Sequence, residues 1–284
     1  MPSPSFHVQA HRGASAEALE NSLPAFQAAI AARADSVELD VHLTSDGELA
    51  VYHDFKLAPA HVLTADGHPL REALTLRTMT WVEIERLRVV DPRRLRGAAA
   101  ARTKFPDAET RIPNLASVFR LFRESSDPWA CRMAIDIEIK SDPRHPQWSA
   151  PPDALAQAVL SLVDRNWERA RTVVRSFDHR VLEALRRELG SDRTLAIAAL
   201  TEKGFSDFAT LARDLHPEIV APEWRSLDRA MVELLHAECI RVIPWTVNSE
   251  VEWERLLGMG VDGATTDDPR ALVTFLGAQG YSPR

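Results

Sequence analysis

Three acidic residues lie in two apolar segments of the sequence, where carboxylates are uncommon. In residues 36–43, SVELDVHL, Glu38 and Asp40 alternate with valine and leucine, and in residues 134–140, AIDIEIK, Glu138 alternates with isoleucine. Because side chains point alternately to the two faces of a strand, these acids lie opposite the apolar face. A buried carboxylate is costly unless it pairs with a cation or binds a metal. An all-oxygen set of this kind suits Mg²⁺ or Ca²⁺ better than zinc.

The alternative to a metal site is a buried ionic network, in which Arg12 and Lys140 neutralise Glu38 and Asp40. An acidic pair on one strand would by itself favour that network. Because Glu138 adds a third carboxylate from a second strand, we favour a site for a divalent cation.

Two of the ten histidines have positions that suit chemistry. His11 ends the first apolar segment, HVQAH, and His53 ends an extended run that follows a Ser-Asp-Gly turn. Two histidines beside a phosphate can act as general base and general acid near neutral pH, and either one can be the base. Arg12 and Lys140 are suited to donate to phosphate oxygens. The other histidines are expected to be ordinary surface or core residues.

The elements that must position these residues follow from the alternation of short apolar segments with amphipathic ones. Strands are expected at 7–11, 36–43, 134–140, 172–177, 194–200, 218–224, 241–247 and 263–267. Helical patterns occur around 23–30, with Asn21 or Ser22 as the cap, around 155–162, and at 179–189, 206–215, 228–238, 250–258 and 269–277.

Alternating strands and helices predict a parallel sheet. Eight strands in 284 residues favour one α/β domain, residues 1–284, folded as a closed (β/α)₈ TIM barrel. The alternative is an open doubly wound sheet, but no G-x-G-x-x-G turn opens the first helix. The three acids lie toward the carboxyl ends of their strands, where barrel enzymes place their active sites.

Residues 55–113 break the strand–helix rhythm and are interpreted as a small insertion after the second strand. A helical pattern at 80–89 is the regular feature expected there. The basic run of the insertion is expected to be a solvated loop rather than a membrane or phosphate patch; it comprises Arg93, Arg94, Arg96, Arg102 and Lys104.

Composition excludes several classes of protein. A net charge of −7 argues against general nucleic-acid binding, and two distant cysteines indicate no disulfide framework. No apolar stretch is long enough for a transmembrane segment. The N-terminus has no signal-peptide pattern, so a cytoplasmic location is expected. The expected partner is a small-molecule substrate, and the sequence does not determine an oligomeric state.

The motifs AHRG, ENS, ELDVHLTSDGELAVYHD, IEIK, WTVN and VDGATTDDP together resemble the glycerophosphodiester phosphodiesterase family over essentially the whole chain. The resemblance implies a TIM barrel with a small insertion after strand 2. It also implies hydrolysis of glycerophosphodiesters to sn-glycerol 3-phosphate and an alcohol, with one divalent cation. Position by position, it implies metal ligands at Glu38, Asp40 and Glu138, an acid–base pair at His11 and His53, phosphate contacts at Arg12 and Lys140, and a supporting role for Glu20.

The chain departs from the family at Leu19, where a proline usually precedes the glutamate. Phe177 and Trp245 follow or end predicted strands, where they could line an apolar slot for the leaving group or simply pack at the barrel mouth.

Other functions compete with this interpretation. One is a lysophospholipase D or phospholipase-type phosphodiesterase that acts on a lipid. A zinc amidohydrolase would need an H-x-H on the first strand, which HRG does not supply. A catalytically inactive binding barrel is disfavoured because every expected site position is filled.

Overall fold

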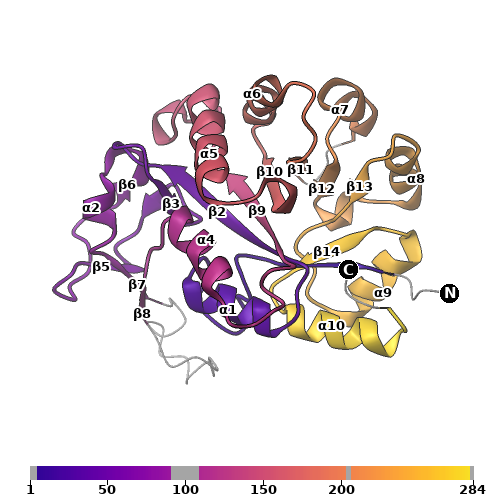
Figure 1. The fold of residues 1–284 in the computed structure, drawn as a ribbon, viewed down its shortest axis with the longest axis horizontal. Helices are drawn as coiled ribbons and strands as arrows, with labels where there is room; N and C mark the ends of the chain where they lie inside the picture. Colours follow the sequence, from indigo (N-terminus) through magenta and orange to yellow (C-terminus); the bar gives the residue numbers. More distant parts are fainter. Residues whose placement is uncertain (1–4, 91–108, 203–205, 282–284) are drawn as a thin grey trace.

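The computed structural model describes residues 5–90, 109–202 and 206–281, and within them eight parallel strands form a barrel surrounded by helices (Figure 1). The strands follow the order β13, β12, β11, β10, β9, β2, β1, β14 around the sheet. Their bounds are β1 (His7–Ala10), β2 (Ser36–Leu43), β9 (Ala134–Ile139), β10 (Thr172–Ser176), β11 (Ala196–Thr201), β12 (Ile219–Pro222), β13 (Arg241–Val242) and β14 (Gly263–Thr266). The TIM-barrel prediction is confirmed.

The barrel closes between its last two strands through backbone hydrogen bonds rather than a regular ladder. The amide of Asp262 donates to Val242 O, and that of Thr265 to Pro244 O, each at 2.9 Å. The predicted strand 241–247 is therefore too long, since β13 ends at Val242. Pro244 has no amide hydrogen to donate to a ladder, which explains the early end.

Helices cover the outside of the barrel, in agreement with the sequence prediction. Their bounds are α1 (Leu23–Ala31), α5 (Pro152–Asn166), α6 (His179–Leu189), α7 (Phe208–Leu215), α8 (Arg229–Ala237), α9 (Glu250–Met259) and α10 (Pro269–Ala278). Short 3₁₀ turns occur at η2 (Pro146–Trp148), η3 (Arg169–Arg171) and η4 (Trp224–Ser226). Among the described residues, no helix is long and apolar enough to cross a membrane.

The sequence prediction missed one helix, α4 (Leu115–Glu124), which precedes β9. Its buried face consists of Leu115, Val118, Phe119 and Phe122, which have helical spacing. Asn114 caps the helix by accepting from the amide of Ser117 at 2.9 Å. The signal was therefore present in the sequence.

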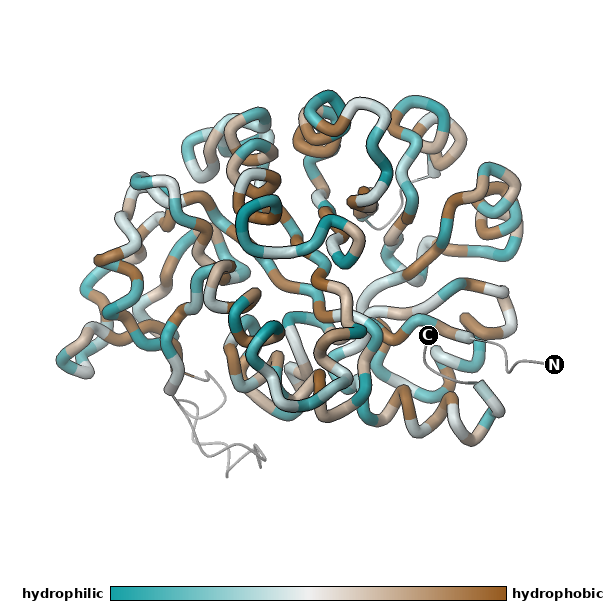
Figure 2. Tube along the Cα trace, in the orientation of Figure 1, coloured by the Kyte–Doolittle hydropathy of each residue, from teal (hydrophilic) through white to brown (hydrophobic). Residues whose placement is uncertain are grey.

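The inner face of the barrel carries the polar side chains. Val37, Leu39 and Val41 pack in the main apolar core between the strands and the helices, shown by brown segments in Figure 2. Because side chains alternate along a strand, Glu38 and Asp40 point into the barrel.

The insertion after β2 is a small antiparallel unit beside the barrel (Figure 1). The extended run expected after the Ser-Asp-Gly turn contains β3 (Leu49–Val51), which pairs antiparallel with β2. The further elements are β4 (Lys56–Leu57), β5 (Val62–Leu63), β6 (Leu74–Thr75), η1 (Leu76–Thr78), α2 (Trp81–Ile84), β7 (Arg88–Val90) and β8 (Glu109–Arg111).

The helical pattern at 80–89 is confirmed only for its first half, because the chain becomes the strand β7 at Arg88. Leu57, Val62, Leu76 and Ile84 belong to a small apolar core of the insertion. The basic residues at 93–104 lie outside the described residues.

Candidate active site

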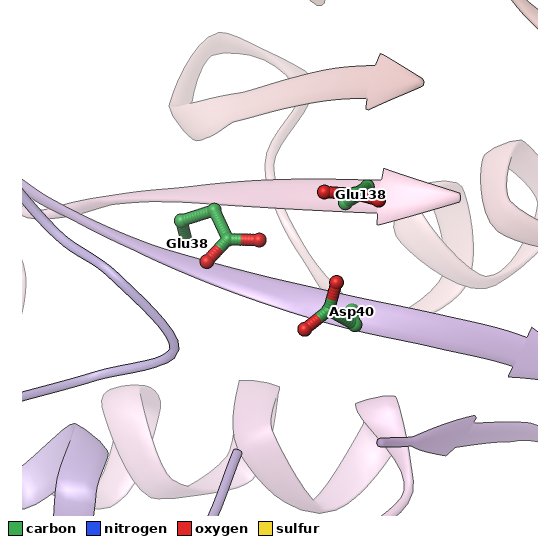
Figure 3. Close-up of side chains that lie close together, drawn as sticks. All are labelled: Glu38, Asp40 and Glu138. Atoms are coloured by element: carbon green, nitrogen blue, oxygen red, sulfur yellow. The ribbon is translucent and has the colours of Figure 1, made fainter. Parts of the chain in front are cut away.

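The three predicted metal ligands come together inside the barrel (Figure 3). Glu38 and Asp40 project from β2, and Glu138 projects from β9, where it lies directly opposite Asp40 in the parallel register. One carboxylate oxygen of each residue lies within 4.8 Å of the others, and all three side chains are buried. The spacing of acids on two adjacent strands thus produces a compact set of oxygen donors.

The carboxylates of this cluster differ in their electrostatic conditions. Burial, with the neighbouring charges of Asp40 and Glu138, raises the pKa of Glu38 well above its ordinary value. Burial also opposes ionisation of Asp40, but the cations of Lys140 and Arg12 hold the pKa of Asp40 below its usual range. A crowded carboxylate such as Glu38 gains stability from a proton or from a metal.

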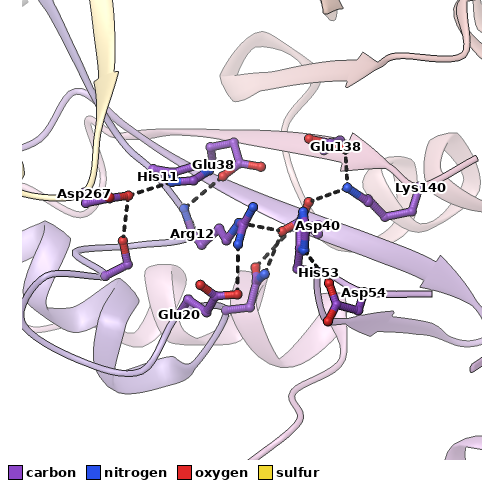
Figure 4. A network of polar contacts seen from close by, with 12 residues as sticks. His11, Arg12, Glu20, Glu38, Asp40, His53, Asp54, Glu138, Lys140 and Asp267 are labelled. Carbon is purple, nitrogen blue, oxygen red and sulfur yellow. Dashed lines mark hydrogen bonds and ion pairs between the residues drawn. The ribbon is translucent and has the colours of Figure 1, made fainter. Parts of the chain in front are cut away.

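Lys140 and Arg12 contact the acids, as the ionic-network alternative requires (Figure 4). Lys140 Nζ lies 2.6 Å from Glu138 Oε1 and 3.4 Å from Asp40 Oδ1. Arg12 Nε lies 3.3 Å from Asp40 Oδ2, while its Nη1 donates to Glu20 Oε1 at 2.9 Å. Although burial works against both cations, these acids raise the pKa of each one.

The ionic network does not neutralise or hydrogen-bond every carboxylate oxygen of the acids. Within the described residues, the buried Asp40 Oδ1 has no hydrogen-bond donor. In this part of the described chain, five carboxylates lie close to three cations, and the excess of negative charge suits a divalent cation. The carboxylates are Glu20, Glu38, Asp40, Asp136 and Glu138, and the cations are Arg12, Lys140 and Arg175. The residues present therefore fit a hard metal ion.

The loop after β1 has a backbone that aims Arg12 at the acids. Arg12 itself has a φ of 54°, and its amide donates to Glu38 Oε2 at 2.8 Å. Gly13 follows with a φ of 83°, and a Cβ there would lie 2.6 Å from the backbone carbon of Ala25. Only glycine allows this close approach of the loop to helix α1.

Both predicted histidines lie in one pocket with the acids. His11 and His53 line a pocket of 260 Å³ together with Glu38, Glu138 and Lys140. His11 Nδ1 lies 2.7 Å from Asp267 Oδ1, and His53 Nδ1 lies 2.7 Å from Asp54 Oδ1. These contacts occupy Nδ1 of each ring and leave each Nε2 for a bound molecule.

Phe177 and Trp245 form an apolar wall of the same pocket. Their rings meet edge to face, with centroids 5.3 Å apart. Trp245 Nε1 donates to Ala221 O at 2.8 Å, so the indole has a partner and presents its ring to the pocket.

A larger pocket of 670 Å³ adjoins the histidines on the side of the insertion. His11, Arg12 and His53 line both pockets, so the two adjoin at these residues.

Sequence reasoning missed two residues that orient the site. Asn21, considered only as a possible helix cap, donates from Nδ2 to Asp40 Oδ2 at 2.7 Å, whereas Ser22 is the cap. Asp267 holds His11, as described above. The signal for Asp267 was its place directly after the last strand, where His11 follows the first.

Comparison with known proteins agrees with this geometry. The family model for glycerophosphoryl diester phosphodiesterases matches residues 11–271. A glycerophosphodiester phosphodiesterase of Caldanaerobacter subterraneus subsp. tengcongensis is 29% identical, with 95% of this chain and 97% of the relative covered. One from Bacillus altitudinis is 30% identical, with 94% and 96% covered.

Solved structures show the same fold. A Silicibacter pomeroyi protein assigned to the glycerophosphoryl diester phosphodiesterases matches with a TM-score of 0.84 and 28% identity, over 99% of this chain and 96% of that one. An Oleispira antarctica phosphodiesterase, solved with the product sn-glycerol 3-phosphate, matches with a TM-score of 0.74 and 20% identity, over 95% and 96%. The chain therefore belongs to the glycerophosphodiester phosphodiesterase family of phosphoric diester hydrolases.

Proposed function

We propose that this chain hydrolyses glycerophosphodiesters to sn-glycerol 3-phosphate and an alcohol, with one Mg²⁺ or Ca²⁺ ion held by Glu38, Asp40 and Glu138. The observation that carries the proposal is the set of three carboxylates within 4.8 Å, in one pocket with His11 and His53. The complex of the Oleispira relative with sn-glycerol 3-phosphate supports the choice of product.

The positive groups of the site hold the phosphate. A divalent ion supplies charge neutralisation to the phosphate when bound. Lys140 has three N–H donors, of which its hydrogen bond to Glu138 uses one, so donors remain for a phosphate oxygen. Arg12 likewise has donors beyond Nε and Nη1, and Glu20 supports Arg12 by fixing its guanidinium.

His11 and His53 move the protons. One histidine takes the proton of the attacking hydroxyl, either water or the glycerol 2-hydroxyl, while the bond from phosphorus to the alcohol breaks. The other histidine gives a proton to the departing alcohol. Attack by the 2-hydroxyl gives a cyclic phosphate, which water opens with the two histidine roles reversed. Phe177 and Trp245 offer an apolar wall to the alcohol.

The test is release of sn-glycerol 3-phosphate from glycerophosphocholine and glycerophosphoethanolamine. EDTA should abolish release, and Mg²⁺ or Ca²⁺ should restore it. Failure of a folded, metal-loaded protein to release the product from either substrate would contradict the proposal.

A second candidate is lysophospholipase D activity on a lipid. Proteins named lysophospholipase D GDPD1 from rat, mouse and human are 25–26% identical over 94% of this chain. The 670 Å³ pocket is lined in part by Leu19, Val51, Val89 and Ile112, an apolar surface that suits a hydrocarbon chain. Choline release from lysophosphatidylcholine in the same assay would separate the two substrates.

A further inference from the structure

We propose that Asp267, together with Asn248, is a positioning unit that fixes the ring of His11 with the proton on Nδ1 and Nε2 turned toward the pocket. This inference rests on the acid–base role proposed above for His11. Neither Asp267 nor Asn248 needs to touch the substrate, because both act through the imidazole.

Three separate loops meet at the Asp267 carboxylate, and Figure 4 shows its contact with His11. Asp267 follows β14, and its Oδ1 accepts from His11 Nδ1 at 2.7 Å and from Ser15 Oγ at 3.1 Å. Asn248, just before helix α9, donates from Nδ2 to Asp267 Oδ2 at 2.7 Å. Both carboxylate oxygens are therefore engaged, so the carboxylate has little freedom to rotate.

Asn248 also fixes the backbone beneath the carboxylate. Its Oδ1 accepts from the amide of Asp267 at 2.9 Å and from Thr266 Oγ1 at 3.1 Å. The amide of His11 in turn donates to Thr266 O at 2.9 Å. The backbone and the side chain of His11 are thus held by the same short segment, 266–267.

The chemistry of the partner determines the tautomer of His11. Burial opposes ionisation of Asp267, but the hydrogen bonds from His11, Asn248 and Ser15 keep the pKa of Asp267 below its ordinary value. An ionised carboxylate only accepts hydrogen bonds, so His11 Nδ1 must carry the proton. In the neutral imidazole, Nε2 is then the nitrogen without a proton.

The second histidine lacks such an arrangement. Its partner Asp54 is the next residue in the chain, with a side chain 56% exposed against 38% for Asp267. Among the described residues, the Asp54 carboxylate is hydrogen-bonded to His53 alone. The ring of His11 is therefore held more firmly than the ring of His53, which has more freedom to rotate.

The decisive experiment compares Asp267→Asn with Asp268→Asn in the full chain. The amide of Asp267→Asn can donate to His11 Nδ1 and so shift the ring proton to Nε2. We expect kcat to fall about 10²-fold or more, with KM and the Kd for the metal nearly unchanged. The side chain of the neighbouring Asp268 caps helix α10 by accepting from the amide of Ala271, and asparagine caps equally well.

The ring tautomer is read directly by NMR of protein with ¹⁵N-labelled histidine. Asp267→Asn should abolish the Nδ1–H signature of His11, whereas Asp268→Asn should retain both this signature and the wild-type kcat. Asn248→Ala should lower kcat about 10-fold, and it should add nothing to Asp267→Asn because it acts through that residue.

Two outcomes would overturn the inference. One is a kcat for Asp267→Asn within about threefold of wild type. The other is an unchanged His11 tautomer in Asp267→Asn, whatever its activity. Because the NMR measurement needs no turnover, it decides the positioning role even if the wild-type chain releases no sn-glycerol 3-phosphate, which would count against the proposed function alone.

Discussion

Strand β9 carries two acids into the barrel, Asp136 and Glu138, and they lie in opposite electrostatic conditions. Asp136 accepts from Arg175 through both carboxylate oxygens, with Nε at 2.6 Å, and from Gln9 Nε2 at 2.6 Å. Thr265 Oγ1 completes this layer by donating to Gln9 Oε1 at 2.7 Å. The lower layer, defined as Gln9, Asp136, Arg175 and Thr265, thus satisfies its one anion with one cation and neutral donors.

The upper layer is defined as Glu38, Asp40 and Glu138. Glu138 follows Asp136 by two residues on β9 and lies opposite Asp40, whereas Glu38 lies opposite Asp136 in the register. The upper layer brings three carboxylates together with Lys140 and Arg12, and it leaves Asp40 Oδ1 without a hydrogen bond in the described chain. Figure 3 shows the three upper acids close together on the adjacent strands β2 and β9. The lower acid is therefore fully paired, whereas the upper acids keep an oxygen that could accept a bound cation.

The largest effect should come from breaking the lower layer. Arg175→Met leaves Asp136 buried without its cation, so we expect the free energy of unfolding to fall by about 3–5 kcal/mol. Urea unfolding in EDTA measures this loss. The double variant Arg175→Met/Asp136→Leu should recover most of it, because a buried ion pair can often be replaced by apolar residues. Wild-type stability in the single variant would mean that the pair is not structural.

Much of the fold and site could be predicted from the sequence because it follows from local patterns. Alternation along β2 and β9 is enough to place Glu38, Asp40 and Glu138 on the inner face. Alternation cannot separate Asp136 from Glu138, since both have the same spacing on the same strand. Their difference depends on Arg175, which comes from another strand and meets Asp136 only after the barrel closes.

The residues that sequence reasoning missed also depend on contacts between distant segments of the chain. Asp267 and Asn248 lie far along the chain from His11, and Asn21, just before α1, meets Asp40 of β2 only in the folded chain. The helix α4 is different, because its apolar residues have helical spacing within one continuous segment, so its sequence alone is enough to predict it.

Removing an acid from the upper layer should weaken metal binding and leave stability intact, the reverse of breaking the lower layer. Glu38→Gln should weaken metal binding about 100-fold or more, since even outer partners of metal ligands change affinity about 10–100-fold. Stability in EDTA should not fall, because the charged form of Glu38 is unfavourable in the metal-free fold. Isothermal titration and urea unfolding measure the two quantities.

Asp136→Asn is the matched control from the lower layer. It should lower stability while leaving metal affinity within about threefold of wild type. Equal losses of metal affinity in Glu38→Gln and Asp136→Asn would remove the distinction between the layers.

Replacing His53 should affect catalysis without affecting the fold or the metal site. His53→Ala is expected to lower kcat about 10²-fold, because a proton transfer is lost, with the metal Kd and the unfolding midpoint unchanged. His236→Ala is the control, since His236 pairs with Asp262 before β14, at the amino end of the strands. Loss of metal affinity in His53→Ala would place His53 among the ligands instead.

The smallest effect is a pH dependence that only the upper layer should show. In the metal-free fold the pKa of Glu38 is raised, so the folded chain binds this proton more tightly than the unfolded chain. The resulting stability is present below the ordinary pKa of Glu38 and is lost as the pH rises through the raised value. Its slope is at most about 1.4 kcal/mol per pH unit for one proton.

The depressed pKa of Asp40 acts in the opposite sense, because its contribution is lost only as the pH falls below the ordinary range of an aspartate. Buried His42 also acts in the opposite sense, because burial lowers its pKa to about 3 and its contribution is lost as the pH falls below the ordinary value of a histidine. Above about pH 7 the Glu38 effect should therefore dominate in EDTA. Urea unfolding across this range should show stability falling with pH in the wild type and a flatter profile in Glu38→Gln. A saturating divalent ion should also flatten the wild-type profile, since it takes the place of the proton. Identical slopes in the two proteins would mean that Glu38 does not titrate in this range, and that the upper acids are as fully paired as Asp136.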